Sequence, residues 1–263
     1  MSRNILVPIV AATLLAGCEQ ERVIDRDQLQ DRNGVFYEVN ATEGFTGTVV
    51  AGRYENGQKK GEATLLKGKL NGVATDWYDN GQKRDEANFI SGERQGVHTE
   101  WYKNGQKRSE TIYVNGEKHG VQSEWHRSGE KKSEMHYVNG NLEGVQTEWY
   151  ENGQKDIEAN FVNGKRHGTE IEWYENGQRK SEGSYVNDKA EGAFVRWYET
   201  GQIELAFNYR DDKAHGIQNR WHENGQKAME FNFVDGVQHG DVTSWTEDGQ
   251  KESEGNYVNG ELQ

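Results

Sequence analysis

A phrase of six residues, Trp-Tyr-Glu-Asn-Gly-Gln, stands at positions 149–154 and again at 173–178, and parts of it recur along the chain. The step between copies is 24 residues, as Gly57 and Gly81 show, and no insertion interrupts it as far as Gly249. A fixed period of roughly 20 to 50 residues is typical of proteins that stack one structural unit on the next. The chain is therefore predicted to fold as an array in which each unit is stabilised by its neighbours.

Each period contains two turn signals. One is the Asn-Gly of the phrase, and the other lies half a period away, as at Asn115-Gly116. Both pairs accept the positive φ angles that hairpin turns require. The runs between them, such as 96–102 and 109–114, are rich in Thr, Val and aromatic residues and too short for globular helices. The predicted fold is all-β, an elongated single-layer antiparallel β-meander built from 24-residue hairpins.

Two aromatic rows follow the same period, because each unit has a Trp and, twelve residues later, a Tyr or Phe. Side chains alternate along a strand, so each run has a side with small residues and one aromatic, and a side with glutamates such as Glu100 and Glu110. Turn parity, which a bulge would flip, decides whether both rows share one side of the sheet. Composition favours the same side, since this gives one semi-apolar and one acidic face. The predicted binding face comprises Trp101, Trp125, Trp149, Trp173, Tyr113, Tyr137, Phe161 and Tyr185.

The low hydrophobic content limits the core that the chain can form. Hydrophobic residues make up 32% of the chain, compared with roughly 45–50% in globular domains. Intrinsic disorder is the alternative explanation of such a composition. The eight regularly spaced Trp residues argue against it. We expect a thin sheet in which neighbouring strands stabilise one another.

The N-terminal residues have the layout of a secretory signal, with Arg3 before an apolar stretch at 5–16 that is too short to span a bilayer as a mature helix. The run Leu-Ala-Gly-Cys, ending at Cys18, resembles the lipobox of bacterial lipoproteins, which implies that Cys18 becomes the lipid-modified first residue. Cys18 is the only cysteine, so an intramolecular disulfide is impossible. The alternative is a plain signal peptide with an incidental cysteine. The residue after the cysteine is Glu19 rather than Asp. Through the same resemblance, this implies an outer-membrane location facing the periplasm.

These patterns divide the chain into three parts. We expect a lipoprotein signal peptide over residues 1–17 and a tether over residues 18–33, because the stretch from Glu19 is charged and unpatterned. The repeat array is expected to occupy residues 34–263, with about nine repeats of which the first and last are incomplete.

The unit running from Tyr137-Val138-Asn139-Gly140 to Gln154 resembles the MORN repeat variant, the second MORN type. Repeats of this kind occur in bacterial proteins grouped as the YwqK family of antitoxins of toxin–antitoxin systems. The resemblance covers roughly residues 34–263, with a degenerate first unit in which Arg53 replaces the Trp. It implies an array of hairpins without catalytic residues and, for some members, the neutralisation of a toxin.

A search for reactive groups indicates no enzyme, no metal site and no cofactor. Four histidines, at 119, 167, 215 and 239, occupy one slot of the repeat, and even neighbouring units would hold them about 10 Å apart, far beyond the bonds of a shared zinc ion. The recurring glutamates are typical of a solvated face, whereas a glycosidase needs a protected acid with a raised pKa. The spacing of phosphate loops and of calcium-binding β-rolls is also missing.

The formal net charge of −13 argues against nucleic-acid binding and favours a basic partner. Periodic lysines are expected to pair across strands with the acidic rows: Lys59, Lys83, Lys107, Lys131 and Lys155. The leading hypothesis is a non-catalytic protein-binding or scaffold module of the cell envelope, tethered to the membrane by lipid on Cys18. The alternatives are an antitoxin or immunity protein that occupies a toxin and, less favoured, a glycan-binding module or enzyme that uses the aromatic rows for stacking.

Overall fold

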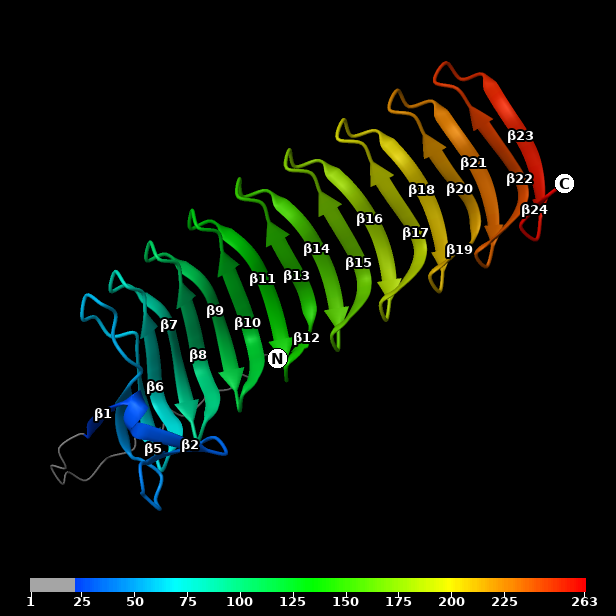
Figure 1. The fold of residues 1–263 in the computed structure, drawn as a ribbon. Coiled ribbons are helices and arrows are strands. Elements are labelled where there is room, and N and C mark those ends of the chain that lie inside the picture. The colour runs from blue at the N-terminus through cyan, green and yellow to red at the C-terminus, as the bar shows by residue number, and fades with distance from the viewer. Residues whose placement is uncertain (1–21) are drawn as a thin grey trace, which may run out of the picture.

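The protein is a long single-layer sheet whose strands follow one another in chain order (Figure 1). The computed structural model describes residues 22–263. In this part of the chain, 22 strands belong to one sheet, and each strand of the array pairs antiparallel with the strands before and after it. The predicted all-β meander of hairpin repeats is confirmed.

Two kinds of strand alternate along the array. Strands of the first kind end on the Trp of each unit: β6 (Lys69–Trp77), β8 (Glu93–Trp101), β10 (Glu117–Trp125), β13 (Gly144–Trp149), β15 (Lys165–Trp173), β17 (Lys189–Trp197), β20 (Gly216–Trp221) and β22 (Val237–Trp245). Strands of the second kind follow the phrase: β7 (Lys83–Ile90), β9 (Lys107–Val114), β11 (Lys131–Val138), β14 (Lys155–Val162), β16 (Arg179–Val186), β18 (Ile203–Arg210), β21 (Lys227–Val234) and β23 (Lys251–Val258). Short strands follow three of these: β12 (Asn141–Leu142), β19 (Lys213–Ala214) and β24 (Glu261–Leu262).

The second turn of each unit is a two-residue hairpin with both residues in the left-handed region. Asn115 has φ 51° and Gly116 has φ 80°, as a type I′ turn requires. The glycine-free turns adopt the same conformation, since φ is 53° at Asn187 and 71° at Asp188. Asn and Asp tolerate this region better than other residues with a β-carbon, which explains how Asp188 and Asp212 can replace glycine here.

The pairing register decides which side chains share a face of the sheet. Val97 lies opposite Ile112, and the next residue, His98, lies opposite Thr111. Near the phrase the register shifts at a bulge, where Trp101 pairs with Lys107. Directly opposed residues point to the same face. The Val97 side of one strand therefore meets the Ile112 side of the next.

This register places the two aromatic rows on opposite faces. Trp101 lies on the Val97 side, whereas Tyr113, which pairs with Gly96, lies on the His98 side. We call these sides the Trp face and the Tyr/Phe face. The prediction that both rows share one side is wrong, because the phrase turn and its bulge set the parity opposite to the assumed one. Four of the predicted binding residues lie on the Trp face and four on the Tyr/Phe face: Trp101, Trp125, Trp149 and Trp173; Tyr113, Tyr137, Phe161 and Tyr185.

The sheet is bent (Figure 1), and its two faces differ in which side chains they bury. The Tyr/Phe face buries mainly small or amide side chains, such as Ala87, Ser133 and Gln218. Gln218 is completely buried, accepts from the Asn208 amide at 2.9 Å and donates to the Asn208 carbonyl at 3.0 Å. On the Trp face, Val97 is 52% exposed. The array thus buries little apolar surface, in agreement with its composition.

The first strands form the one apolar cluster of buried residues in the described chain, with Leu29, Phe45, Val49 and Leu65. They are β1 (Val23–Asp25), β2 (Leu29–Arg32), β3 (Val35–Glu38), β4 (Gly47–Val50), β5 (Gly61–Leu66) and the 3₁₀ turn η1 (Arg26–Gln28). Strand β1 pairs parallel to β4, and β2 forms a hairpin with β3. Residues 22–33, expected to be a tether, are therefore folded against the start of the array. The predicted signal peptide and Cys18 lie outside the described residues.

Candidate functional site

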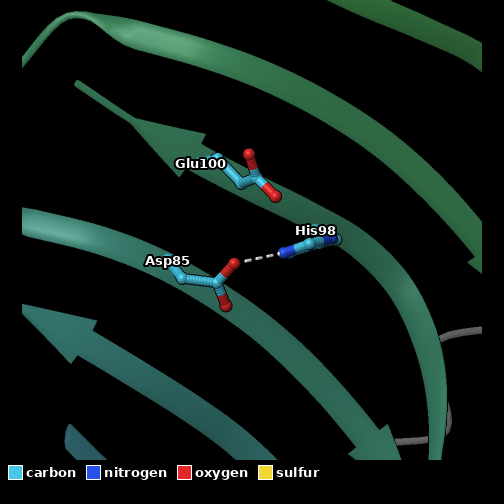
Figure 2. A group of neighbouring side chains, drawn as sticks. All are labelled: Asp85, His98 and Glu100. Atoms are coloured by element: carbon cyan, nitrogen blue, oxygen red, sulfur yellow. Dashed lines mark hydrogen bonds and ion pairs between the residues drawn. The ribbon is translucent and has the colours of Figure 1, made fainter.

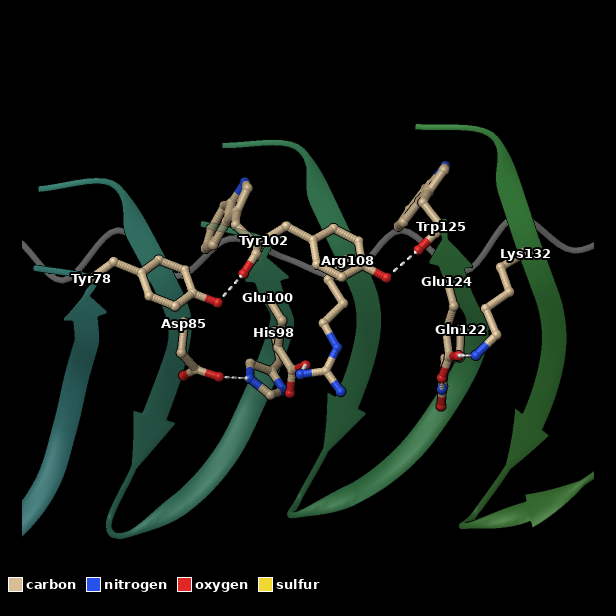
Figure 3. Close-up of polar contacts among 11 residues, drawn as sticks. Tyr78, Asp85, His98, Glu100, Tyr102, Arg108, Gln122, Glu124, Trp125 and Lys132 are labelled. Atoms are coloured by element: carbon tan, nitrogen blue, oxygen red, sulfur yellow. Dashed lines mark hydrogen bonds and ion pairs between the residues drawn. The ribbon is translucent and has the colours of Figure 1, made fainter. Parts of the chain in front are cut away.

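The Tyr of the phrase bonds each unit to the next. The hydroxyl of Tyr102 donates to the carbonyl oxygen of Trp125 at 2.8 Å, and Tyr78 makes the same bond to Trp101 (Figure 3). Where His126 replaces the Tyr, its Nε2 lies 2.8 Å from the Trp149 carbonyl oxygen. The bond also recurs at other units, from Tyr54, Tyr150, Tyr174, Tyr198 and His222.

The Asn of the phrase works in two directions. The Asn80 side-chain amide donates to the Lys103 carbonyl of the next turn at 2.9 Å, and its oxygen accepts from the Gln82 backbone amide at 3.1 Å. One side chain therefore fixes its own turn and couples it to the following one. The same pair of contacts is made by Asn56, Asn104, Asn152, Asn176 and Asn224. The phrase is a building unit of the array.

The periodic lysines serve the Trp row. Lys83 forms an ion pair with Glu86 three residues along the same strand, and its Nζ lies 5.7 Å from the centroid of the Trp101 ring. The expected cross-strand pairing of these lysines is therefore wrong, because the nearest carboxylate on their face belongs to their own strand. All eight Trp are half-buried. Cations also approach the rings of Trp125, Trp149, Trp173 and Trp245.

A hollow of about 280 Å³ opens on the Tyr/Phe face over β8 to β11. Its lining is polar and carries both charges. Tyr113 and Lys118 form part of its wall. Arg108 stands beside Glu100, and Lys132 stands beside Glu124 (Figure 3). This set of groups suits a ligand or protein segment with hydrogen-bonding and charged groups.

His98 lies at the edge of this hollow as a buried histidine between two carboxylates (Figure 2). Its Nε2 is 2.6 Å from Oδ2 of Asp85 on β7, and its ring centroid is 5.9 Å from that of Tyr113. Glu100, two residues along β8, is 3.5 Å from the Arg108 guanidinium. Asp85, His98 and Glu100 each offer one ligand atom, and these three atoms lie within 4.8 Å of one another. His98 is only 8% exposed, so packing holds this ring in place.

Asp85 and His98 stand at two positions of the repeat that vary from unit to unit, with residues such as Ile157 and Leu205 at the first and Glu170 and Phe194 at the second. Serines occupy the position of Asp85 in later units: Ser109, Ser133, Ser181 and Ser253. Glutamines occupy the position of His98 in later units: Gln122, Gln146 and Gln218. The sequence search missed His98 because it considered only the recurring histidine slot. A comparison of each unit with the repeat would have found the signal.

Charged side chains of opposite sign form pairs along the Tyr/Phe face. Arg84 is 2.7 Å from Asp76, and this hydrogen bond raises the pKa of the Arg84 guanidinium. Lys180 is paired with Glu172 in the same way at 3.0 Å. In the unit before that of Lys180, the repeat position that Arg84 and Lys180 occupy in their own units holds Asp156 instead of a cation. Burial, followed by the neighbouring Asp156 carboxylate, raises the pKa of Tyr150 to about 12.

A family profile described as MORN repeat variant matches seven segments that together exceed half of the chain. They are residues 70–91, 94–115, 118–139, 142–163, 166–187, 214–235 and 238–259. The unit between the fifth and sixth segments is not matched, yet β17 and β18 pair as in the others. No curated protein sequence matches the chain. Among residues 22–263, no helix has the length and apolar character needed to cross a membrane.

Proposed function

Because the chain belongs to the MORN repeat variant family, we propose that it is a non-catalytic module that binds another protein through the hollow on its Tyr/Phe face. Repeats of this family generally serve as non-enzymatic modules. The observation that carries the proposal is the division between repeated and unrepeated residues. The phrase is occupied by bonds between units, as at Tyr102, whereas the hollow adjoins the positions of Asp85 and His98, at which the residue varies from unit to unit.

The chemistry of the hollow favours a polar, partly basic segment of the partner. Glu100 and Glu124 have loosely paired carboxylates, since their cations lie 3.5 and 3.7 Å away. Loose pairs at a surface contribute little to stability, so an incoming cation can replace Arg108 or Lys132 at small cost. The net charge of −13 would also accelerate the approach of a basic partner.

The membrane tether in this proposal rests on Cys18 and the lipobox-like residues before it. Bacterial lipoproteins carry several acyl chains, and two or more chains hold a protein stably on a bilayer. We expect the wild-type protein to fractionate with outer membranes and Cys18→Ser to be unprocessed or released in soluble form. Wild-type protein in the cytosol with residues 1–17 still attached would overturn the tether and favour a cytoplasmic antitoxin.

Glycan binding by aromatic stacking is less favoured on the Tyr/Phe face. The Lys118 Nζ lies 4.8 Å from the Tyr137 ring centroid, and the Arg94 guanidinium lies 5.5 Å from that of Tyr113. These rings are therefore already covered by cations of the protein, whereas stacking on a sugar needs an open ring face.

The proposal is tested by photocross-linking in intact cells. A photoreactive phenylalanine analogue is placed at Lys132, on the rim of the hollow, or at His136, which is exposed on the same strand but on the Trp face. We expect a discrete adduct with an envelope protein from position 132 and little adduct from position 136. Equal labelling, or labelling from position 136 alone, would show that the hollow is not the binding site. A toxin in the adduct would identify the antitoxin alternative.

A further inference from the structure

Asp85, His98 and Glu100 bring together donor atoms that are typical of a transition-metal site. Asp85 comes from β7, and His98 and Glu100 come from the adjacent strand β8. A tetrahedral zinc site has bonds of about 2.0–2.2 Å to imidazole and carboxylate, which sets its donor atoms about 3.3 Å apart. The donor atoms here lie within 4.8 Å of one another. Small rotations of the carboxylates would close this difference.

The exposure of the three side chains suits such a closure. His98 is held by packing, with only 9% of its side chain exposed, while the side chains of Asp85 and Glu100 are each 32% exposed. A fixed imidazole and two adjustable carboxylates can reach a common ion without movement of the backbone. The hollow beside Glu100 leaves room for a water molecule as the fourth ligand.

The donor set also separates the candidate metals. Imidazole favours Zn²⁺, Cu²⁺, Ni²⁺ and Fe²⁺, whereas Mg²⁺ and Ca²⁺ prefer oxygen ligands alone. Among the residues that the structure describes, Arg108 is the one cation in an ion pair with Glu100, at 3.5 Å, and it would have to turn aside. Among residues 22–263, no second group of three His, Cys or acidic residues shows this spacing.

We propose that Asp85, His98 and Glu100 bind one divalent transition-metal ion, with Zn²⁺ as the expected species. The ion takes the place of the hydrogen bond between the His98 ring and Asp85, and the neutral imidazole binds it through Nε2 with its own hydrogen on Nδ1. The proposal does not depend on the proposed protein-binding function. It instead gives a role to Asp85 and His98, which stand at two variable positions of the repeat.

Repeat residues supply variants that are expected to fold. His98→Gln and Asp85→Ser each introduce the residue that later units carry at the same position, as at Gln122 and Ser109. We would measure Zn²⁺ binding to the full-length protein by isothermal titration calorimetry, with Co²⁺ absorption reporting the coordination geometry. We expect one site in the wild-type protein, with affinity at least tenfold lower in either variant. Arg108→Gln should raise the affinity, because it removes the competing cation.

A transplanted site provides the complementary test. The next unit already has Glu124 at the position of Glu100, so Ser109→Asp combined with Gln122→His would reproduce all three donors. This protein should bind two ions instead of one. Equal Zn²⁺ binding by the wild-type protein and a double variant carrying Asp85→Ser and His98→Gln would place the ion on other histidines and overturn the proposal. A transplant that binds no second ion would show that these donors do not suffice, and would overturn it as well.

Discussion

The bond from each phrase Tyr to the next unit should have a measurable free energy. Tyr174 donates its hydroxyl hydrogen to the Trp197 carbonyl oxygen at 2.7 Å and is half-buried. A hydrogen bond of this kind contributes about 0.5–1.5 kcal/mol to stability. Tyr174→Phe removes the bond and keeps the ring, so we expect the free energy of unfolding to fall by about 1 kcal/mol.

Tyr209→Phe is the matched control, because Tyr209 belongs to the other aromatic row. Its ring makes an edge contact with Phe194 at 6.3 Å, and among the described residues its hydroxyl has no hydrogen-bond partner. Removing this hydroxyl should change the free energy of unfolding by less than about 0.5 kcal/mol. The pair of variants therefore separates the loss of the bond from the loss of a hydroxyl group.

Urea unfolding followed by Trp fluorescence measures both variants, with circular dichroism to test whether the transitions coincide. Adding Tyr78→Phe, in a distant unit, should roughly double the loss, because separate sites contribute additively. A loss of 1 kcal/mol corresponds to a fall in melting temperature of about 2–4 °C for a domain of this size. Equal unfolding midpoints for Tyr174→Phe, Tyr209→Phe and the wild type would refute the structural role of the phrase.

Three further predictions concern packing, register and pH. Trp149→Ala should lower the free energy of unfolding by about 2 kcal/mol. This is half of the roughly 3–5 kcal/mol expected for a fully buried Trp, because Trp149 is half-buried. A negligible loss of stability would show that the Trp row is an exposed surface. Deleting one full period, residues 105–128, should leave a folded, shorter array, whereas deleting the half period 105–116 should not. Equal melting temperatures for the two deletion variants, measured by circular dichroism, would refute the repeat register. The pKa of Tyr150 is raised from 10.0 to about 12, so its contribution to stability is fully present below pH 10 and is lost as the pH rises to 12. An equally steep fall in the free energy of unfolding between about pH 10 and 12 for the wild type and Tyr150→Phe would contradict this.

The fold was predictable from the sequence because its determinants are local. The step of 24 residues defines the unit, and turns such as Asn115-Gly116 define the hairpins. The pairing of faces was not predictable, since it depends on a bulge that shifts the register before the Trp of each unit, as beside Trp101. A single residue of slip moves a whole row to the other face.

The N-terminal fold and the site escaped prediction for different reasons. Residues 23–32 lack a clear alternating pattern, and β1 is a strand because it pairs with the distant β4. The group around His98 depends on cross-strand neighbours, and sequence spacing alone does not bring Asp85 to its ring. The predicted aromatic binding residues gave no hint of it, because the hollow is lined mainly by polar residues between them.

The central claim is that the repeated phrase builds the array, whereas residues at variable positions of the repeat, such as Asp85 and His98, create the binding site. The most direct test is the photocross-link yield from position 132 in protein that also carries Asp85→Ser and His98→Gln. We predict that the yield falls at least tenfold while the urea midpoint stays at its wild-type value, and that Tyr174→Phe lowers the midpoint but leaves the yield unchanged. An undiminished yield from the Asp85→Ser, His98→Gln protein would contradict the claim.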